Sequence, residues 1–252
     1  MAEVLFEKRN HTGLLTMNKP ETLNALSSGF IEEINRALDL AESDRDVYVL
    51  LITGSGKSFS VGADIEEMYD KNSQEIFQWS NFGSNLNLRI EKMPVPVIAL
   101  INGYALGGGL ELAMACDIRL AADTAKLGLP ETSLGVICGA GGTQRLPRIV
   151  GYSAAKEMIF TGKKIDTQEA LSIGLVNHVY PASELEEDGF KLASQIEKNG
   201  RLAVRTAKKA IAFSKESDIE KGCLFEREIF SKLFETEDQK ICMGGFLERK
   251  KK

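Results

Sequence analysis

The sequence predicts an α/β fold, and two observations carry this prediction. Short apolar runs rich in β-branched residues occur at Val47–Thr53, Val97–Ile101 and Ile118–Ala121, and such runs are typical of strands buried on both faces. Segments with helical spacing of apolar residues separate these runs. An alternation of buried strands and helices is typical of a parallel sheet covered by helices.

The first part of the chain is expected to form a hairpin followed by a helix. Residues 3–18 alternate between apolar and polar side chains on both sides of a short turn, which indicates two paired strands. Ser27 or Ser28 is a suitable N-cap for a helix that ends near Ala41. After the strand that ends at Thr53, we expect a loop.

The middle of the chain repeats a strand, a glycine-containing loop and a helix. The loops are expected at residues 54–64, 102–109 and 128–146, and the helices at residues 65–70, 74–92 and 110–116 and from Gly142 onward. Met93-Pro94-Val95-Pro96 ends the second of these helices, because proline cannot continue a helical hydrogen-bond pattern.

From about residue 190 the pattern is almost entirely helical. We therefore predict a core domain at residues 1–190, which carries the site, and a helical C-terminal region at residues 191–252. Apolar residues in this region are too many for an isolated helix pair, which favours burial against a partner subunit. They are Cys223, Leu224, Phe225, Ile229, Phe230, Leu233, Phe234 and Phe246.

Composition excludes several classes of function. A net charge of −5 argues against a nucleic-acid-binding protein, which would normally have a basic excess. The N-terminus does not resemble a signal peptide, and no run of 18 apolar residues occurs, so neither secretion nor a membrane span is expected. The four cysteines show no C-x-x-C spacing, and the two histidines, His11 and His178, have no ligand-like neighbours. We therefore expect no metal, no disulfide framework and a cytoplasmic location.

Two glycine-rich segments resemble nucleotide-binding loops only superficially. Residues 53–58 (TGSGKS) follow a strand, but a phosphate-binding loop requires glycine where Leu51 stands. Residues 139–144 (GAGGTQ) resemble a dinucleotide fingerprint, but its third glycine is replaced by Gln144 and no strand precedes it closely. The chain also has no G-x-S-x-G motif of an α/β-hydrolase.

Three features that remain together indicate chemistry on a carbonyl compound. Residues 107–109 (GGG) precede a helix whose unsatisfied N–H groups and dipole favour an anion, and Ala63 precedes a second, shorter helix. Two such N–H donors would form an oxyanion hole, worth about 3–4 kcal/mol per donor. Glu111 and Glu131 follow these loops and would supply acid–base groups. Taken singly, the glycines are explained equally well by close packing, and each glutamate by an ordinary first-turn or loop acid.

With these residues in view, the sequence resembles the enoyl-CoA hydratase/isomerase (crotonase) family over nearly its whole length. The resemblance is carried by LNAL (23–26), GADI (62–65), NGYALGGGLELAMACD (102–117), LPE (129–131), GAGGTQRL (139–146) and FETEDQK (234–240). It implies a spiral of ββα units and a C-terminal helical region that forms trimers, which commonly stack into hexamers. It also implies a coenzyme A thioester as substrate, with no separate cofactor.

The resemblance also assigns roles to individual residues. The backbone N–H groups of Ala63 and Gly108 would hold the thioester oxygen, and Glu111 and Glu131 would hold and activate the water. Isomerases of the family usually keep only one such glutamate, so the pair favours addition of water to a trans-2-enoyl-CoA. The positions that match coenzyme A contacts are Lys57, Ser60, Asp64, Ile65, Phe230 and Arg249, the last two possibly reaching a neighbouring subunit.

Several departures from the family pattern keep alternatives open. Cys138 stands where hydratases often have proline, and Glu21 stands where many relatives have a basic residue. Trp79 and Phe82 would either line the acyl pocket or simply pack in the core. The alternatives to a hydratase are an isomerase or specialised dehydratase that uses the same oxyanion hole, and a non-catalytic acyl-CoA-binding subunit.

Overall fold

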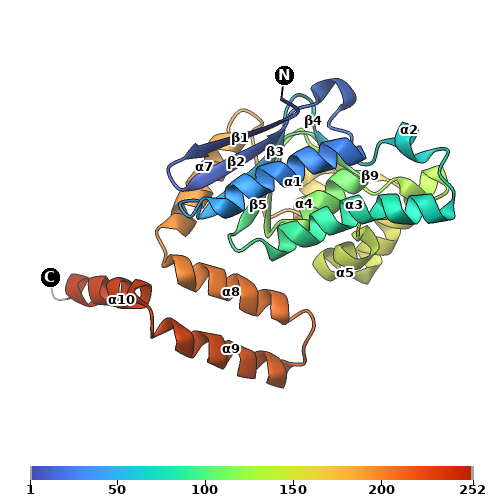
Figure 1. The fold of residues 1–252 in the computed structure, drawn as a ribbon. Coiled ribbons are helices and arrows are strands. Elements are labelled where there is room, and N and C mark those ends of the chain that lie inside the picture. The colour runs from blue at the N-terminus through green and yellow to red at the C-terminus, as the bar shows by residue number, and fades with distance from the viewer. Residues whose placement is uncertain (1, 251–252) are drawn as a thin grey trace.

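Two sheets form the core of the protein, and the computed structural model describes residues 2–250 of it (Figure 1). The larger sheet contains, in spatial order, β1 (Val4–Arg9), β2 (Thr12–Met17), β3 (Val49–Gly54), β5 (Val97–Ile101), β7 (Ile118–Ala122) and β10 (His178–Tyr180). The β1–β2 pair is the predicted antiparallel hairpin, and all other neighbours run parallel. The three apolar runs form adjacent strands, which confirms the α/β prediction.

A second sheet corrects the expectation that the segments after these strands are loops. It contains, in spatial order, β4 (Ser58–Ser60), β6 (Tyr104–Leu106), β8 (Lys126–Gly128) and β9 (Lys164–Asp166). The first three strands run parallel, and β9 runs antiparallel to β8. A strand of three residues offers too few positions to show a period of two, so the sequence pattern could not reveal it.

The helices lie between and around these strands. They are η1 (Pro20–Thr22), α1 (Ser28–Ser43), α2 (Ile65–Met68), α3 (Ser73–Lys92), α4 (Gly108–Ala115), η2 (Glu131–Leu134), α5 (Gly142–Thr161, kinked at Gly151), α6 (Thr167–Ser172), α7 (Leu185–Glu197), α8 (Arg201–Phe213), α9 (Ile219–Leu233) and α10 (Glu237–Arg249). Local sequence sets their starts. Ser27 caps α1 by accepting a hydrogen bond from Phe30 N, and Asn72 forms a capping box with Glu75 at the start of α3.

The chain advances as a spiral of ββα units. In three successive turns, β3, β5 and β7 add to the larger sheet, and β4, β6 and β8 add to the smaller one. Each pair is followed by helices: α2 and α3 after β4, α4 after β6, and α5 after β8 (Figure 1). The spiral of ββα units is therefore confirmed. Its parallel register places the segments that follow β4, β6 and β8 at one edge of the smaller sheet.

The helix α7 belongs to the core. It packs against β3, β5 and β7, and its residues Leu185 and Ala193 are buried. Gly189 faces Leu100 so closely that a built Cβ atom would lie 2.7 Å from a Leu100 methyl carbon. The predicted boundary at residue 190 falls inside this helix, so the separate helical region starts at α8.

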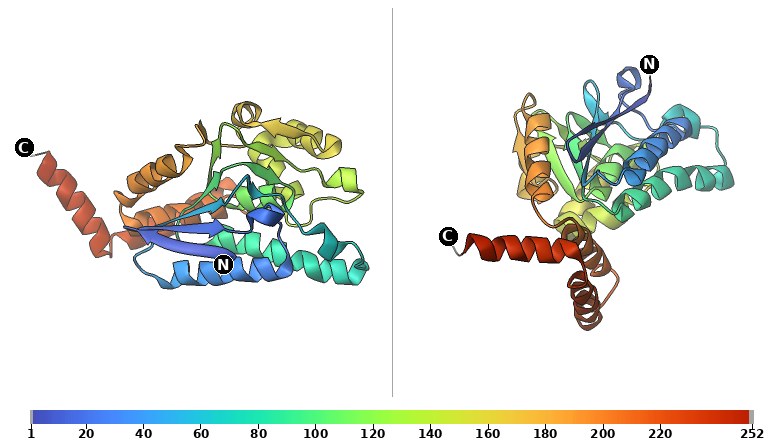
Figure 2. Two further views of the ribbon diagram at one scale, coloured as in Figure 1. Left: turned by 90° about the horizontal axis from the view of Figure 1, so that it is seen from above. Right: turned by 60° about the vertical axis from the view of Figure 1, so that its left-hand side comes forward.

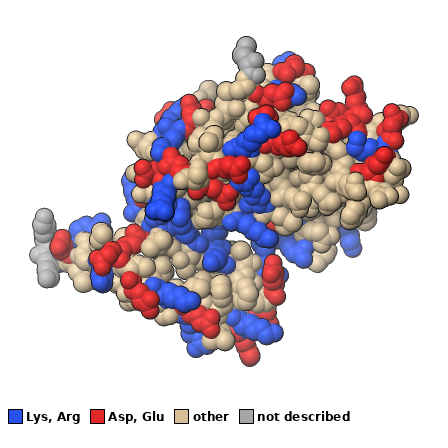
Figure 3. All heavy atoms as spheres, in the orientation of Figure 1, with Lys and Arg blue, Asp and Glu red and all other residues tan. Residues whose placement is uncertain are grey.

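The last three helices project from the core (Figure 2). Lys208 on α8 connects this region to the core, because its Nζ donates to Asp117 Oδ2 (2.7 Å) and to Val95 O (2.9 Å). Lys and Arg side chains gather on the face where α8 meets the core (Figure 3). No residue of α8, α9 or α10 is buried. Large apolar side chains that are exposed there include Ile211, Ile219, Leu224, Phe230, Phe234, Ile241, Phe246 and Leu247.

Candidate active site

The candidate oxyanion-hole residues lie side by side at the edge of the smaller sheet. Ala63 and Gly108 follow the adjacent parallel strands β4 and β6 within three residues. A Cβ atom built on Gly108 would lie 3.4 Å from Ala63 N. Within residues 2–250, neither backbone N–H donates a hydrogen bond to a backbone or side-chain acceptor. The fold therefore presents two adjacent free donors.

The three glycines at residues 107–109 have different tasks. Gly107 has a φ of +52°, a conformation that favours glycine. Gly109 packs against β4, because a Cβ atom there would lie 2.1 Å from Ser60 O. Gly108 has only ordinary contacts around a built Cβ atom, the nearest at 3.4 Å. Close packing thus explains Gly109, while Gly108 carries the free N–H.

Glu111 is buried one turn into α4. Its side chain is only 2% exposed, and its Oε1 accepts hydrogen bonds from Ala140 N (2.9 Å) and Gly142 N (2.6 Å). Burial raises the pKa of Glu111 to about 7; the Gly142 N–H opposes this shift, and the negative charge of Glu131 adds to it. Both protonation states of Glu111 are therefore populated near neutral pH.

Glu131 approaches the loop at Gly107 from the third turn of the spiral. It follows β8 within three residues and starts the short helix η2. Both carboxyl oxygens are shielded from solvent and have no hydrogen-bond partner of normal geometry among the described residues. A Cβ atom built on Gly107 would lie 3.4 Å from Glu131 Oε1. Burial also raises the pKa of Glu131.

The raised pKa of Glu111 predicts a stability cost at neutral and alkaline pH. Because the folded state binds this proton more tightly than the unfolded chain, its stabilising effect is complete below about pH 4.5 and is lost as the pH rises through about 7. The cost is roughly 3 kcal/mol when the loss is complete. We therefore expect Glu111→Gln to raise the melting temperature relative to the original protein by several degrees at pH 8 and by much less at pH 4.5. Thermal unfolding at both pH values measures this; an equal shift at both would contradict it.

The remaining candidate residues of the core occupy different environments. Lys57 and Ile65 are exposed. The Asp64 side chain caps α2 by accepting from Glu66 N (3.0 Å). Lys57 and Ile65 thus remain open to a ligand, and Asp64 has a structural task.

Ser60 differs from the expectation that it contacts coenzyme A. Its side chain is fully buried. Its hydroxyl donates to Asn24 O (2.8 Å) and accepts from Gly62 N (3.1 Å). The Ser60 side chain therefore holds the loop that presents Ala63, and it has no exposed surface with which to contact a nucleotide.

Phe230 and Arg249 lie away from this site in the same chain. They belong to α9 and α10, which pack against α8 in the projecting region (Figure 2). Both side chains are exposed. The fold of a single chain thus brings together Ala63, Gly108, Glu111 and Glu131 but leaves these two residues apart.

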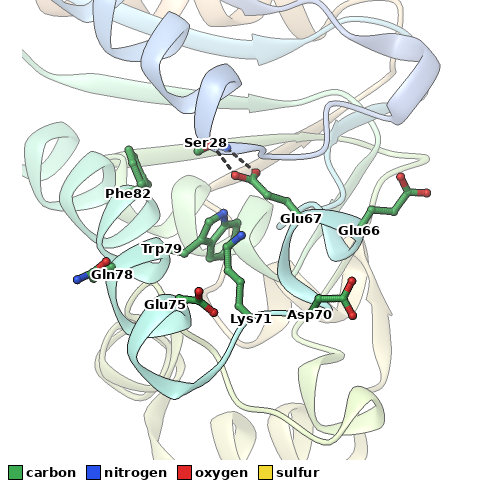
Figure 4. A pocket seen from close by; sticks show the side chains of 9 residues that line it. All are labelled: Ser28, Glu66, Glu67, Asp70, Lys71, Glu75, Gln78, Trp79 and Phe82. Carbon is green, nitrogen blue, oxygen red and sulfur yellow. Dashed lines mark hydrogen bonds between the residues drawn. The ribbon is translucent and has the colours of Figure 1, made fainter.

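A cavity of about 500 Å³ lies between α2 and α3 (Figure 4). It is lined by Ser28, Glu66, Glu67, Asp70, Lys71, Glu75, Gln78, Trp79 and Phe82. The two helices that line it are connected to the candidate site: α2 starts directly after Ala63 and Asp64, and on α3 a Cβ atom built on Gly83 would lie 3.3 Å from Ala140 Cβ. Trp79 and Phe82 therefore line a cavity rather than the core.

Sequence reasoning missed some residues that organise the site. Glu67 points to the start of α1, where its carboxylate accepts from Ser28 N (2.8 Å) and from the Ser28 hydroxyl (Figure 4). The N–H groups of Ala140 and Gly142, which bind Glu111, lie in the segment considered above as a dinucleotide fingerprint. The glycines of this segment indicate that its backbone lies close to another group. That group is the Glu111 carboxyl rather than a phosphate.

No group of three or more His, Cys, Asp or Glu side chains within residues 2–250 is arranged to hold a metal ion. Across the same residues, no helix combines the length and apolar character needed to cross a membrane.

Comparisons with known proteins agree with this architecture. The family model described as enoyl-CoA hydratase/isomerase matches residues 7–252. A short-chain-enoyl-CoA hydratase from Clostridium acetobutylicum is 44% identical, with 98% of this chain and 95% of that protein covered. A crotonyl-CoA hydratase from Syntrophomonas wolfei is 43% identical, with coverage of 98% and 96%.

Solved structures extend the similarity to three dimensions. The crystal structure of an enoyl-CoA hydratase from Bacillus anthracis superimposes with a TM-score of 0.95 at 38% identity, covering 98% of this chain and 96% of that one. The match of the family model, the identities and this superposition all extend over nearly the full chain. The chain therefore belongs to the enoyl-CoA hydratase/isomerase family.

Proposed function

We propose that the protein is an enoyl-CoA hydratase, which reversibly adds water across the C2=C3 bond of a trans-2-enoyl-CoA to give a 3-hydroxyacyl-CoA. One observation carries this proposal: the free N–H groups of Ala63 and Gly108 lie side by side, with the Glu131 carboxyl beside Gly107 and the buried Glu111 carboxyl one turn further along α4. The relatives named as short-chain and crotonyl-CoA hydratases, which align over nearly the whole chain, support it.

In this mechanism the thioester oxygen binds to the N–H groups of Ala63 and Gly108. As water attacks C3, electrons move from the C2=C3 bond toward this oxygen, and the two donors stabilise the enolate-like charge, each by about 3–4 kcal/mol. Because both donors are already in place and unpaired, no reorganisation accompanies the reaction.

The two carboxyl groups divide the proton transfers. Ionised Glu111 takes a proton from the attacking water, and protonated Glu131 delivers a proton to C2. The product thus gains one hydroxyl and one hydrogen, and the exchanged proton returns between the two carboxyl groups or through solvent. A pKa of Glu111 near 7 suits a base at neutral pH.

The coenzyme A moiety and the acyl group would bind at separate places near this centre. We place the nucleotide near exposed Lys57 and Ile65, and the acyl group in the cavity between α2 and α3. Phe230 and Arg249 would complete the coenzyme A site from a neighbouring subunit, since they lie away from the site of their own chain.

The direct test is a turnover screen with clean protein. Loss of the conjugated enoyl absorbance is measured with crotonyl-CoA and with longer 2-enoyl-CoA substrates. Absence of hydration at every chain length would overturn the proposal. Faster conversion of a 3-enoyl-CoA would identify an isomerase, and tight acyl-CoA binding in calorimetry without turnover would identify a non-catalytic binding subunit.

The exposed apolar side chains of α8–α10 predict self-association. The family resemblance implies a trimer or a dimer of trimers, and side chains such as Ile211, Phe230 and Phe246, which are more than half exposed in a single chain, support burial against a partner subunit. Sedimentation equilibrium measures the mass. Replacing Phe230 with glutamate is expected to weaken the assembly, whereas Glu32→Gln on the outer face of α1 is the control; a monomeric original protein would contradict the prediction.

The four free cysteines, two of them exposed, favour a reducing compartment, and we place the protein in the cytoplasm.

A further inference from the structure

Two side chains bind the carbonyl group of Ala140 from different helices. Asn87 Nδ2 of α3 donates to Ala140 O (3.0 Å), and Arg145 Nη1 of α5 donates to the same oxygen (2.8 Å). Along the chain, this carbonyl stands between the two N–H groups that donate to Glu111, those of Ala140 and Gly142. The backbone segment at residues 140–142, which holds the Glu111 carboxyl, is therefore itself held by two side chains.

The guanidinium of Arg145 lies directly against Gly141. A Cβ atom built on Gly141 would lie 2.0 Å from Arg145 Nη1, and Gly141 has a φ of +102°, so only glycine suits this position. The Arg145 side chain is only 11% exposed, and its Nη2 pairs with Glu91 Oε2 of α3 at 2.9 Å. Because a guanidinium is planar and carries several N–H groups, it can bind two partners from one fixed position. Arg145 thus connects the segment at residues 140–142 to α3.

An ion pair with Glu91 alone would not explain this geometry. Such a pair needs only one side of the guanidinium, whereas Arg145 directs its second donor at a carbonyl that Asn87 also binds. Asn87 is almost fully buried, at 2% exposure. A carbonyl oxygen has two lone pairs, so these two donors occupy it. The Ala140 carbonyl is therefore fixed, and the N–H groups on both sides of it keep their direction toward Glu111.

On the basis of the proposed hydratase function, we propose that Asn87 and Arg145 are positioning residues, which bind the Ala140 carbonyl and thereby hold the Glu111 carboxyl where it takes a proton from water. Both act through the backbone of residues 140–142 rather than on the substrate. Arg145 also supplies a positive charge that favours ionised Glu111, the form that acts as the base.

The charged and titratable groups around Glu111 come from several elements. Burial is the main influence that raises the pKa of Glu111 to about 7; the charge of Glu131 on η2 adds to it, and the charge of Arg145 on α5 opposes it. Cys138 lies just before the segment at residues 140–142, and burial raises the pKa of its thiol above the usual range, so it stays neutral.

The remaining neighbours of α4 add little charge. From α3, Glu91 faces Arg145, and Lys215 in turn contacts Glu91 (3.3 Å). The residues of β4 and β6 are uncharged, and Tyr104 of β6 is exposed. Arg145 is thus the cation whose removal acts on Glu111.

The first test removes the guanidinium. Because Glu111 acts as the base, loss of the positive charge raises its pKa and moves the acidic limb of kcat/KM for crotonyl-CoA to higher pH. We expect Arg145→Met to show this shift and to lower kcat roughly 10- to 100-fold, the effect of losing a hydrogen bond from a charged group, with little change in KM. Arg145→Lys keeps a positive charge and is expected to restore the acidic limb and part of kcat.

Arg148→Met is the matched control, because it makes the same change on the same helix. Arg148 is exposed, and its guanidinium also donates to a backbone carbonyl, Gln144 O (2.6 Å), outside residues 140–142. This variant is expected to keep the rate and the pH profile of the original protein. An Arg145→Met enzyme with the acidic limb of Arg148→Met would overturn the role of Arg145, as would an Arg145→Lys enzyme shifted as far as Arg145→Met.

Asn87→Ala tests the second donor without a change of charge, and it remains informative if Arg145→Met does not fold. Loss of one neutral hydrogen bond is expected to lower kcat roughly 3- to 10-fold, again with little change in KM. Asn85→Ala makes the same change at an exposed position of α3 and is expected to keep the full rate. Equal kcat values in the two alanine variants would overturn the role of Asn87.

A measurement without turnover separates this inference from the proposed function. A ¹³C NMR titration follows the glutamate carboxyl carbons, with Glu111 assigned by its loss in Glu111→Gln. The pKa of Glu111 is expected to be higher in Arg145→Met than in Arg148→Met, and an equal value would overturn the inference. If the NMR shift is observed but the original protein hydrates no enoyl-CoA, only the proposed function is overturned.

Discussion

Replacing Glu111 with glutamine is expected to lower kcat for crotonyl-CoA hydration by roughly 10²–10⁴-fold, and Glu131→Gln is expected to have an effect of the same size. Glutamine has nearly the same shape but can neither accept the proton of water nor deliver one to C2. The amide oxygen at position 111 can still accept from Ala140 N and Gly142 N, so the loop is expected to keep its place. Initial rates across substrate concentrations measure kcat and KM, and calorimetry with a saturated acyl-CoA measures binding.

A double variant that combines Glu111→Gln and Glu131→Gln tests this prediction further. Because the two carboxyl groups act in one reaction, removing both is expected to cost much less than the product of the single effects. Glu32→Gln, on the exposed face of α1, makes the same chemical change away from the site and is expected to retain full activity. If Glu111→Gln or Glu131→Gln kept the hydration rate of the original protein, the replaced glutamate would not take part in proton transfer.

The second large effect is expected from Gly108→Ala. The backbone N–H remains, but the new methyl group would lie 3.4 Å from Ala63 N, within the space where the thioester oxygen has to bind. All contacts of this methyl group are at ordinary van der Waals distances, so the fold is expected to persist. Blocking the oxyanion from its donors is expected to lower kcat by roughly 10²–10³-fold, the effect of losing one donor. Steady-state kinetics together with the circular dichroism spectrum measure the two parts of this prediction.

Gly29→Ala is the matched control for that variant. Gly29 lies in α1, and a Cβ atom there meets nothing within 4 Å. It is expected to keep full activity and to gain slightly in stability, because alanine favours a helix. A Gly108→Ala enzyme as active as this control would show that the thioester oxygen does not bind between Ala63 and Gly108.

Much of the larger sheet and its helices could be predicted from local sequence, and the smaller sheet could not. The strand β5 was predicted with its observed bounds, because its five residues are all buried and apolar. The strands β4 and β6 are three residues long, and their pairing depends on contacts between successive turns of the spiral. Such contacts leave no periodic signal in a single sequence.

The candidate site shows the same division. Glu111 and the glycines at residues 107–109 could be recognised from the sequence because they stand at the start of a helix. Free backbone N–H groups and acidic side chains are common in the first turn of a helix. The position of Glu131 is different, since it depends on the third turn of the spiral to bring β8 beside β6. The sequence also could not show that the Ser60 hydroxyl bonds within the protein, because its acceptor, Asn24 O, lies in a segment 36 residues earlier.

The spiral has a consequence for how this kind of site can change over evolution. In the proposed mechanism one donor follows β4, the other donor and the base Glu111 follow β6, and the acid Glu131 follows β8, so the acid is carried by a turn of its own. A substitution in the third turn can therefore alter or remove proton transfer while the first two turns still grip a thioester. Such an arrangement is modular, because one turn of the spiral can change while the N–H groups that bind the thioester stay in place. New reactions on acyl-CoA compounds can therefore arise by substitutions in a single turn.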